Sequence, residues 1–203
     1  MILMLNCSYK AKDSNTQYFL ELLTKELEAE ETEIINIRNV LNGGFSEFTE
    51  KLKQAEAFVI GAPLYVDGLP AQAVKLLEML LEAGNAGLSG KQVYVVSNLG
   101  FYECAQICNL FDIVRNWCDR MQMVYGGGLA IGAGPMISTL KSLPLNKGLN
   151  KDIGKGLKVL AYNIRNGESM ENYYAKTRIP RLVYLQAAHT MFRRTLKAGN
   201  SDE

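Results

Sequence analysis

The stretch MILMLNCSYKAKDSNT (residues 1–16) decides the fold that the rest of the chain follows. Residues 1–5 are an uninterrupted apolar run, which predicts a strand buried on both faces. A polar loop begins at Asn6, and Ser14 stands at the head of an amphipathic stretch that predicts a first helix over residues 16–29. A buried strand that leads through a polar loop into a helix is the opening unit of an α/β fold.

The loop between this strand and this helix has the composition of an anion site. The first N–H groups of a helix have no partners within the helix, and the helix dipole favours negative charge there. Hydroxyl, amide and ammonium groups stand beside that helix end: Ser8, Lys10, Ser14, Asn15 and Thr16. We interpret the loop as a phosphate cradle. The alternative is an ordinary helix cap, because Ser14 followed by Gln17 also fits a capping box.

The bulk composition is that of an ordinary globular protein. The 203 residues are 48% apolar and 21% charged, which predicts one domain with a sizeable core. The formal net charge of +1 argues against a nucleic-acid binder, which usually carries a basic face. No apolar run approaches the roughly 20 residues of a membrane span, and the N-terminus shows no signal-peptide pattern. We therefore expect a cytoplasmic protein without nucleic-acid or membrane partners.

The four cysteines, Cys7, Cys104, Cys108 and Cys118, match no metal-binding or disulfide pattern, so no metal site is predicted. Cys104 and Cys108 are one helical turn apart, which leaves a redox pair or a shared ligand set as an alternative. Buried free thiols are the simpler interpretation.

The rest of the chain alternates strands and helices. Apolar runs predict further strands at residues 32–37, 57–62, 92–97 and 124–131. Three glycines in the last of these runs indicate close backbone packing or a bulge. Strands that are apolar throughout predict a parallel sheet covered by helices on both faces, which is a doubly wound α/β fold.

Helical spacing predicts the helices between these strands. Residues 38–46 are predicted to be a loop that leads into a short helix at residues 47–54. The predicted buried stripes of three later helices are Val74, Leu77 and Leu81; then Ile107, Phe111, Val114, Cys118 and Met121; then Ile153, Leu157, Leu160 and Ile164. A loop rich in Gly, Pro and Ser is predicted over residues 132–145.

A final helix is predicted over residues 180–197. Its apolar stripe consists of Leu182, Leu185, His189, Phe192 and Leu196, with Tyr184 and Met191 beside it. So broad an apolar arc requires burial, and a second subunit could provide it. His189 is the only histidine, and its place on this stripe favours a packed or interface role over a catalytic one.

Three loops of unusual composition follow predicted strands: residues 6–16, 63–70 and 98–103. In a doubly wound sheet, ligands bind at the carboxyl ends of the strands, where the strand order reverses. The strand order 2-1-3-4-5 would bring the three loops to one edge of the sheet. Phosphate donors in the first loop, with aromatic side chains and backbone amides in the other two, suit a flat amphipathic ring with a phosphate tail.

On these three loops the chain resembles the flavodoxin-like NAD(P)H-dependent FMN reductase family, in the branch with a helical C-terminal extension. The resemblance rests on Cys7-Ser8 with Ser14-Asn15-Thr16, on Ala62-Pro63-Leu64-Tyr65, and on Asn98-Leu99-Gly100-Phe101-Tyr102-Glu103. The glycines of residues 126–128 and Ile179-Pro180-Arg181 add support. It implies a three-layer sandwich around a five-stranded parallel sheet, formed as one FMN-binding domain over residues 1–203, with residues 145–203 as the extension.

The resemblance also implies where the cofactor binds. Ser8, Ser14, Asn15 and Thr16 would hold the FMN phosphate, while Lys10 adds a positive charge or is a solvated lysine. The flavin ring would lie beside Pro63, Leu64, Tyr65, Val66 and Asp67, and its other edge would be covered by Asn98, Leu99, Gly100, Phe101, Tyr102 and Glu103. The alternative for Tyr65 and Tyr102 is a place in the core, and for Asp67 a helix-flanking position.

The implied activity is transfer of hydride from NADH or NADPH to FMN, followed by electron transfer to a second small-molecule acceptor. Since the flavin does this chemistry, no catalytic side chain is predicted. Relatives of this fold dimerise over the flavin, which implies a homodimer or a higher homo-oligomer. Some relatives carry an iron–sulfur centre after the second strand, but residues 38–46 contain no cysteine, so none is expected here.

Two other functions stay open at this point. A flavodoxin-type electron carrier would bind FMN without nicotinamide turnover, although flavodoxins tend to be strongly acidic and this chain is near neutral. A cofactor-free interaction module would act through the C-terminal helix, and the presence of all three loop motifs argues against it.

Overall fold

The computed structural model describes residues 1–10, 13–132, 147–175 and 178–199. Within these ranges six parallel strands form one sheet in the order β2-β1-β3-β4-β5-β6. The strands are β1 (Ile2–Asn6), β2 (Thr32–Asn36), β3 (Ala57–Pro63), β4 (Gln92–Asn98), β5 (Val124–Ile131) and β6 (Tyr173–Ala175). The predicted order of the first five strands is confirmed. The prediction of a five-stranded sheet was wrong, because the short β6 within the C-terminal extension pairs with β5.

The helices alternate with these strands along the chain. They are α1 (Asn15–Glu26), α2 (Ile37–Asn39), the π-helical turn η1 (Val40–Gly44), α3 (Phe45–Gln54), α4 (Ala71–Ala83), α5 (Ile107–Arg120), the 3-10 turn η3 (Gly148–Asn150), α7 (Lys151–Asn166) and α8 (Arg181–Gly199). The loop predicted at residues 38–46 was wrong, because this segment is helical. Asn36 caps it by accepting the Arg38 N–H at 2.9 Å, and Ile37 and Val40 bury one side of the turn. The loop predicted over residues 132–145 falls mainly outside the described residues.

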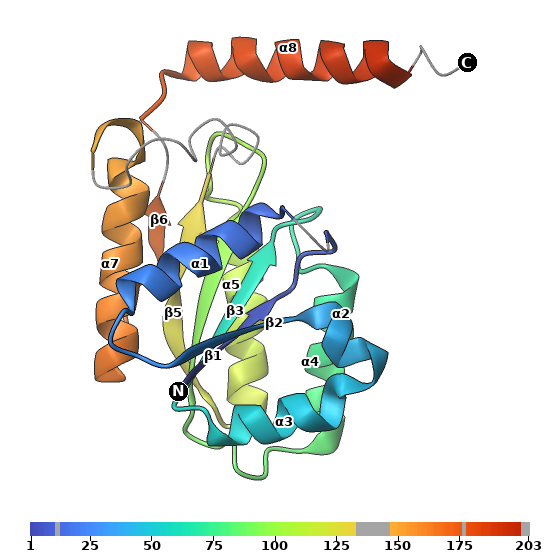
Figure 1. Cartoon of the computed structure of the whole chain (residues 1–203), viewed down its shortest axis with the longest axis vertical. Coiled ribbons are helices and arrows are strands. Elements are labelled where there is room, and N and C mark those ends of the chain that lie inside the picture. Colours follow the sequence, from blue (N-terminus) through green and yellow to red (C-terminus); the bar gives the residue numbers. More distant parts are fainter. Residues whose placement is uncertain (11–12, 133–146, 176–177, 200–203) are drawn as a thin grey trace.

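Helices cover both faces of the sheet, which makes three layers (Figure 1). On one face α1 and α7 pack against the sheet, with Phe19 and Leu157 in the same hydrophobic cluster. On the other face α3, α4 and α5 contribute Phe48, Leu76 and Phe111 to a second cluster. The two clusters account for the continuous apolar runs in the strands, since alternate residues of each strand enter opposite layers.

The helical stripes are confirmed for α5 and α7, whose predicted residues are buried. The stripe of α4 is rotated from the prediction: Val74 is 39% exposed, and the buried side consists of Ala73, Leu76, Leu77 and Leu80. Apolar residues occur around most of this helix, so spacing alone could not choose between neighbouring faces.

The glycines of β5 lie where two rings approach the backbone. A Cβ added to Gly126 would collide with the Tyr94 ring, and one added to Gly128 would collide with the Phe111 ring. The pairing of β5 with β4 also shifts between Val93 and Tyr94, opposite Gly126. Close packing and a bulge, which the three glycines indicated as alternatives, are both present.

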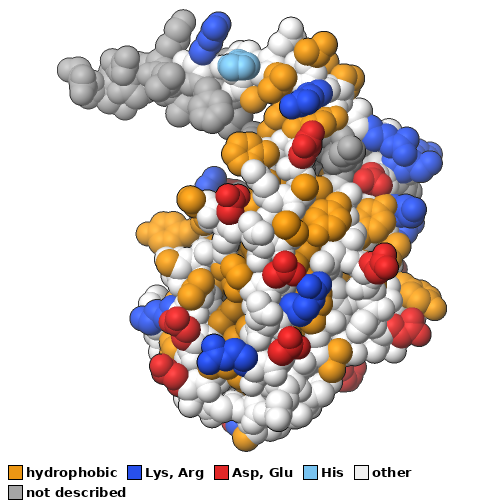
Figure 2. All heavy atoms as spheres, turned by 180° about the vertical axis from the view of Figure 1, so that it is seen from behind, with side chains coloured by type: hydrophobic (Ala, Val, Ile, Leu, Met, Phe, Trp, Pro, Cys, Tyr) orange, Lys and Arg blue, Asp and Glu red, His pale blue; other side chains and the backbone are white. Residues whose placement is uncertain are grey.

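Helix α8 extends away from the body of the protein (Figure 1). Leu182, Val183 and Leu185 are 75%, 50% and 42% exposed, whereas Tyr184 is buried. Figure 2 shows hydrophobic side chains around the start of α8 and His189 exposed farther along it. His189 is therefore not packed within the chain, and an interface role stays a prediction. The side chains of Met191, Phe192 and Leu196 lie outside the described part. None of the described helices has the length and apolar character needed to cross a membrane.

Candidate cofactor site

Three loops leave the carboxyl edge of the sheet side by side: the first loop (residues 6–16), the second loop (63–70) and the third loop (98–103). The hydrogen-bond ladders continue into each of them. The Cys7 N–H donates to the Gly61 carbonyl at 2.7 Å, and the Leu64 N–H donates to the Asn98 carbonyl at 2.9 Å. The third loop is attached in the same way, because the Leu99 N–H donates to the Ile131 carbonyl at 3.1 Å. The loops therefore start from fixed positions.

A cavity of about 160 Å³ lies where the three loops meet. It is lined by Ser8, Lys10, Asp13, Ser14, Asn15, Thr16, Pro63, Leu64, Tyr65, Asn98, Leu99 and Gly100. All five candidates of the first loop line it, and so do three from each of the other loops. The convergence expected from the strand order is thus present in the structure.

Asn6 shapes the start of the first loop. Its side-chain oxygen accepts the Ser8 N–H at 2.9 Å, and its amide nitrogen donates to Gln17 Oε1 at 2.8 Å. This arrangement turns the chain so that the buried Ser8 side chain lines the cavity. Asn6 was not among the predicted site residues. Its position two residues before Ser8 at a strand end is the signal that an Asx turn leaves in a sequence.

Ser14 is the N-cap of α1. Its Oγ accepts the Gln17 N–H at 3.0 Å, which confirms the helix cap that the sequence left as an alternative. The rest of the capping box is absent, because the Gln17 side chain bonds to Asn6 and Glu21. A hydroxyl that accepts one hydrogen bond still has its own hydrogen to donate. Capping and anion binding by Ser14 are therefore compatible.

Thr16 connects the first loop to the third. Its side chain is buried, and its hydroxyl donates to Asn98 Oδ1 at 2.9 Å across 82 residues of sequence. Since the hydroxyl hydrogen is used in this bond, direct phosphate contact by Thr16 would come from its backbone N–H at the start of α1. The hydroxyl instead fixes the distance between two of the three loops.

Charges of both signs lie at the first loop. Lys10 and Asp13 are exposed residues that line the cavity, and the Arg38 guanidinium lies 4.5 Å from the centre of the Tyr9 ring. Asp13 was not predicted, and a carboxylate opposes anion binding. Lys10 offsets the charge of Asp13 at the cavity, and the positive end of α1 then favours an anion there.

The second loop contains a tight turn with two hydrogen bonds. The Tyr65 N–H donates to the Gly68 carbonyl at 3.0 Å, and the Gly68 N–H donates to the Tyr65 carbonyl at 3.1 Å. Val66 and Asp67 have φ angles of 47° and 60°, a left-handed conformation that is unfavourable for a β-branched side chain. Val66 and Asp67 were predicted to lie beside the flavin ring. Neither lines the cavity, because both residues are on the exposed turn. Tyr65 is 47% exposed, so it is not a core aromatic.

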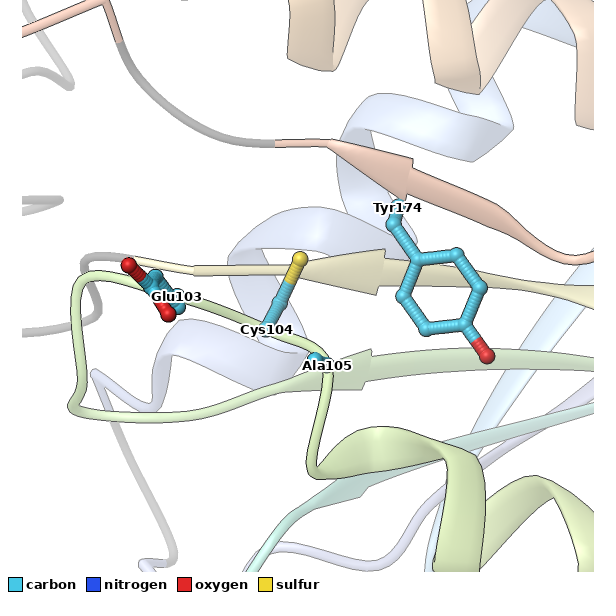
Figure 3. A pocket seen from close by; sticks show the side chains of 4 residues that line it. All are labelled: Glu103, Cys104, Ala105 and Tyr174. Atoms are coloured by element: carbon cyan, nitrogen blue, oxygen red, sulfur yellow. The ribbon is translucent and has the colours of Figure 1, made fainter.

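The remaining residues of the third loop line two neighbouring cavities. Phe101, Tyr102 and Glu103 lie against the start of α8 in a cavity of about 320 Å³. Glu103 also lines a cavity of about 440 Å³ with Cys104, Ala105 and Tyr174 (Figure 3). The described residues that line this larger cavity include no serine or threonine. The donors therefore identify the cavity of about 160 Å³ as the candidate for a phosphate.

The cysteines occupy different environments. Burial raises the pKa of Cys7, and it raises that of Cys118 to about 12, so both remain thiols near neutral pH. Cys104 is buried before the start of α5, while Cys108 is exposed within that helix, so the interpretation of buried thiols fails for Cys108. No cluster of His, Cys, Asp and Glu in the described parts of the chain could hold a metal ion.

Comparison with known proteins identifies a family for this chain. Residues 1–131 match the protein family described as NADPH-dependent FMN reductase. A search of curated proteins finds no match.

Three solved structures illustrate the likeness in fold. RosB with its bound intermediate 8-demethyl-8-formylriboflavin-5'-phosphate is 17% identical with a TM-score of 0.57, over 81% of this chain and 77% of that chain. An oxidoreductase from Corynebacterium diphtheriae is 15% identical with a TM-score of 0.56, over 81% of this chain and 96% of that chain. The flavodoxin of Streptococcus pneumonia TIGR4 is 14% identical with a TM-score of 0.59, over 82% of this chain and 98% of that chain.

At such identities the structures show the fold alone, and this fold is flavodoxin-like. The family match spans β1 to β5 and all three loops of the cavity. On that match the chain belongs to the NADPH-dependent FMN reductase family, whose cofactor is FMN, and it is an FMN-dependent oxidoreductase.

Proposed function

We propose that this protein takes hydride from NADH or NADPH onto FMN and passes the electrons to a second small molecule, such as a flavin or a quinone. The observation that carries the proposal is the cavity in which the hydroxyls of Ser8 and Ser14 meet the N-terminus of α1 and the third loop. Hydroxyl and amide donors at a helix N-terminus suit the phosphate of FMN.

The residues of the cavity fit this cofactor. Ser8, Ser14 and Asn15 would hold the phosphate with the first amides of α1, and Lys10 would add positive charge. A cavity of about 160 Å³ has room for the phosphate and part of the ribityl chain. The ring would lie against Tyr65 and the backbone around Gly100, at the open side of the site.

FMN, when bound, supplies the ring that accepts and releases hydride. The chain's own residues then bind and orient. The Thr16–Asn98 hydrogen bond holds the first and third loops at a fixed separation, and the ladder bonds of Leu64 and Leu99 fix the second and third loops to the sheet. Rigid attachment of this kind places a bound ring in one orientation, which hydride transfer requires.

The experiment that tests this function is the visible spectrum of the purified protein under anaerobic conditions, before and after addition of NADH or NADPH. We expect a flavin spectrum that bleaches with at least one nucleotide and recovers when an acceptor is added. A flavin that stays oxidised with both nucleotides would identify the electron carrier. A protein without flavin that takes up no added FMN would contradict both functions and favour the interaction module.

A homodimer and a cytoplasmic location belong to the same proposal. The exposed Leu182, Val183 and Leu185 on α8 support the dimer, because exposed apolar side chains on one helix are typical of an interface. We expect sedimentation velocity to give a dimer that dissociates when Leu182 and Leu185 are both changed to serine. A monomer for the unmodified protein at micromolar concentration would contradict it.

A further inference from the structure

The third loop is attached to the part of the chain that follows the family match. The Tyr184 hydroxyl, on α8, donates to the Gly100 carbonyl. The Tyr102 hydroxyl donates in the other direction, to the Ile179 carbonyl, at 2.8 Å. Residues 132–203 lie beyond the match at residues 1–131, so these bonds join a family loop to a segment outside the family pattern.

Packing reinforces these two bonds. Ile179 and Tyr184 are buried and form a small hydrophobic cluster with Tyr102 and Leu149, separate from the two core layers. The ring centres of Tyr102 and Tyr184 are 5.3 Å apart. Burial raises the pKa of the Tyr184 phenol, so its hydroxyl keeps its hydrogen to donate well above neutral pH.

The extension also confines the loop near β6. The Cys104 thiol lies toward the end of β6, where it donates to the Ala175 carbonyl at 3.4 Å (Figure 3). Gly132, whose N–H donates to the same carbonyl at 3.1 Å, lies against the loop backbone. A Cβ added to Gly132 would lie 2.6 Å from the Tyr102 carbonyl oxygen, so the backbones meet without space for a side chain.

The Tyr184 bond determines the orientation of one peptide group. The peptide between Gly100 and Phe101 is planar and trans, so its N–H points away from its carbonyl oxygen. With that oxygen directed to Tyr184, the Phe101 N–H points to the opposite side of the loop. Gly100 lines the cavity of about 160 Å³, and the Phe101 N–H has no hydrogen bond within the described part of the chain.

We infer that Tyr184 is a positioning residue of the proposed FMN site, which holds the Gly100–Phe101 peptide so that the Phe101 N–H is a donor for the polar edge of the flavin ring. The inference rests on the proposed function. It gives the C-terminal extension a role in cofactor binding, although none of the described residues of this segment lines the cavity.

The test compares Tyr184→Phe with Tyr173→Phe. Both changes keep the ring and remove one phenol hydroxyl of the C-terminal extension, but the Tyr173 hydroxyl donates to Asp152, whereas the Tyr184 hydroxyl donates to Gly100. Loss of one such hydrogen bond is worth about 1 kcal/mol, so we expect the Kd for FMN to rise about 5- to 10-fold in Tyr184→Phe and less than about 2-fold in Tyr173→Phe. The Kd for riboflavin should rise by the same factor in Tyr184→Phe, because the effect acts on the ring and not on the phosphate.

Amide hydrogen exchange of the flavin-free proteins provides a readout that does not depend on FMN. Tyr184→Phe should exchange faster than the unmodified protein in a peptide that spans the third loop. An unchanged exchange rate, or equal changes of Kd in the two variants, would overturn the inference. A protein whose third loop loosens in Tyr184→Phe but which binds no FMN would instead contradict the proposed function.

Discussion

Ser14→Asp is expected to weaken FMN binding by about 100-fold or more and to leave the fold as stable as before. Aspartate is as good an N-cap as serine, so it can accept the Gln17 N–H that Ser14 now accepts. Its carboxylate would stand in the cavity where the phosphate is proposed to bind. Two like charges about 4 Å apart near a protein surface repel by about 4 kcal/mol. The positive end of α1 offsets part of this repulsion.

The Kd for riboflavin tests whether the effect of Ser14→Asp acts on the phosphate of FMN. Riboflavin lacks the phosphate, so its Kd should change less than about 3-fold in Ser14→Asp. Ser14→Ala is the matched control: it removes the cap, costs about 1 kcal/mol of unfolding free energy, and brings in no charge. Titrations of both ligands with each variant, alongside urea unfolding, separate the two roles of Ser14. Equal weakening for FMN and riboflavin in Ser14→Asp would show that the loop is a helix cap and not a phosphate cradle.

Phe111→Ala is expected to reduce the free energy of unfolding by about 3–5 kcal/mol, a large share of the 5–15 kcal/mol of an ordinary domain. Phe111 is completely buried, its ring lies against Gly128 of β5, and it meets the Tyr174 ring of β6 edge-on at 6.0 Å. The glycine has no side chain to fill the space that the ring would leave, so the cavity would persist. Urea unfolding monitored by circular dichroism measures the loss.

Ile113→Ala is the control for this change, because it lies on the same helix and is 40% exposed. It should cost less than about 1 kcal/mol. If Phe111→Ala also costs less than about 1.5 kcal/mol, α5 does not pack on β5 as described.

The sequence predicted the elements whose signal is local and strong. The run AFVIGA at residues 57–62 is apolar throughout, and it can be placed in the middle of a covered parallel sheet without knowledge of its neighbours. The stripe from Ile107 to Met121 on α5 was equally clear. β6 was not predictable in this way, because a strand of three residues with a partly exposed pattern carries no periodicity.

The candidate site was predicted as a set of loops, and its internal contacts were not. Hydroxyl and amide residues at strand ends predict an anion site from composition alone. The partner of Thr16 lies 82 residues away, and the partner of Tyr184 lies 84 residues away. Such contacts depend on how the sheet and the extension fold together, and no local pattern specifies them. The structure thereby shows that the Thr16 hydroxyl connects two loops, which leaves the predicted phosphate contact to the backbone N–H of this residue.

The parallel pairing of β6 with β5 has a consequence for the solution behaviour of the protein. The Met170 N–H donates to Gly126 at 2.9 Å, and β6 pairs with Leu129 to Ile131, so the extension occupies the outer edge of β5 at two places. Without it, an apolar strand of eight residues would offer its unpaired amides and carbonyls to another chain. The edge that remains at β6 is three residues long. The extension therefore replaces an aggregation-prone edge with one too short to recruit a strand from a neighbour.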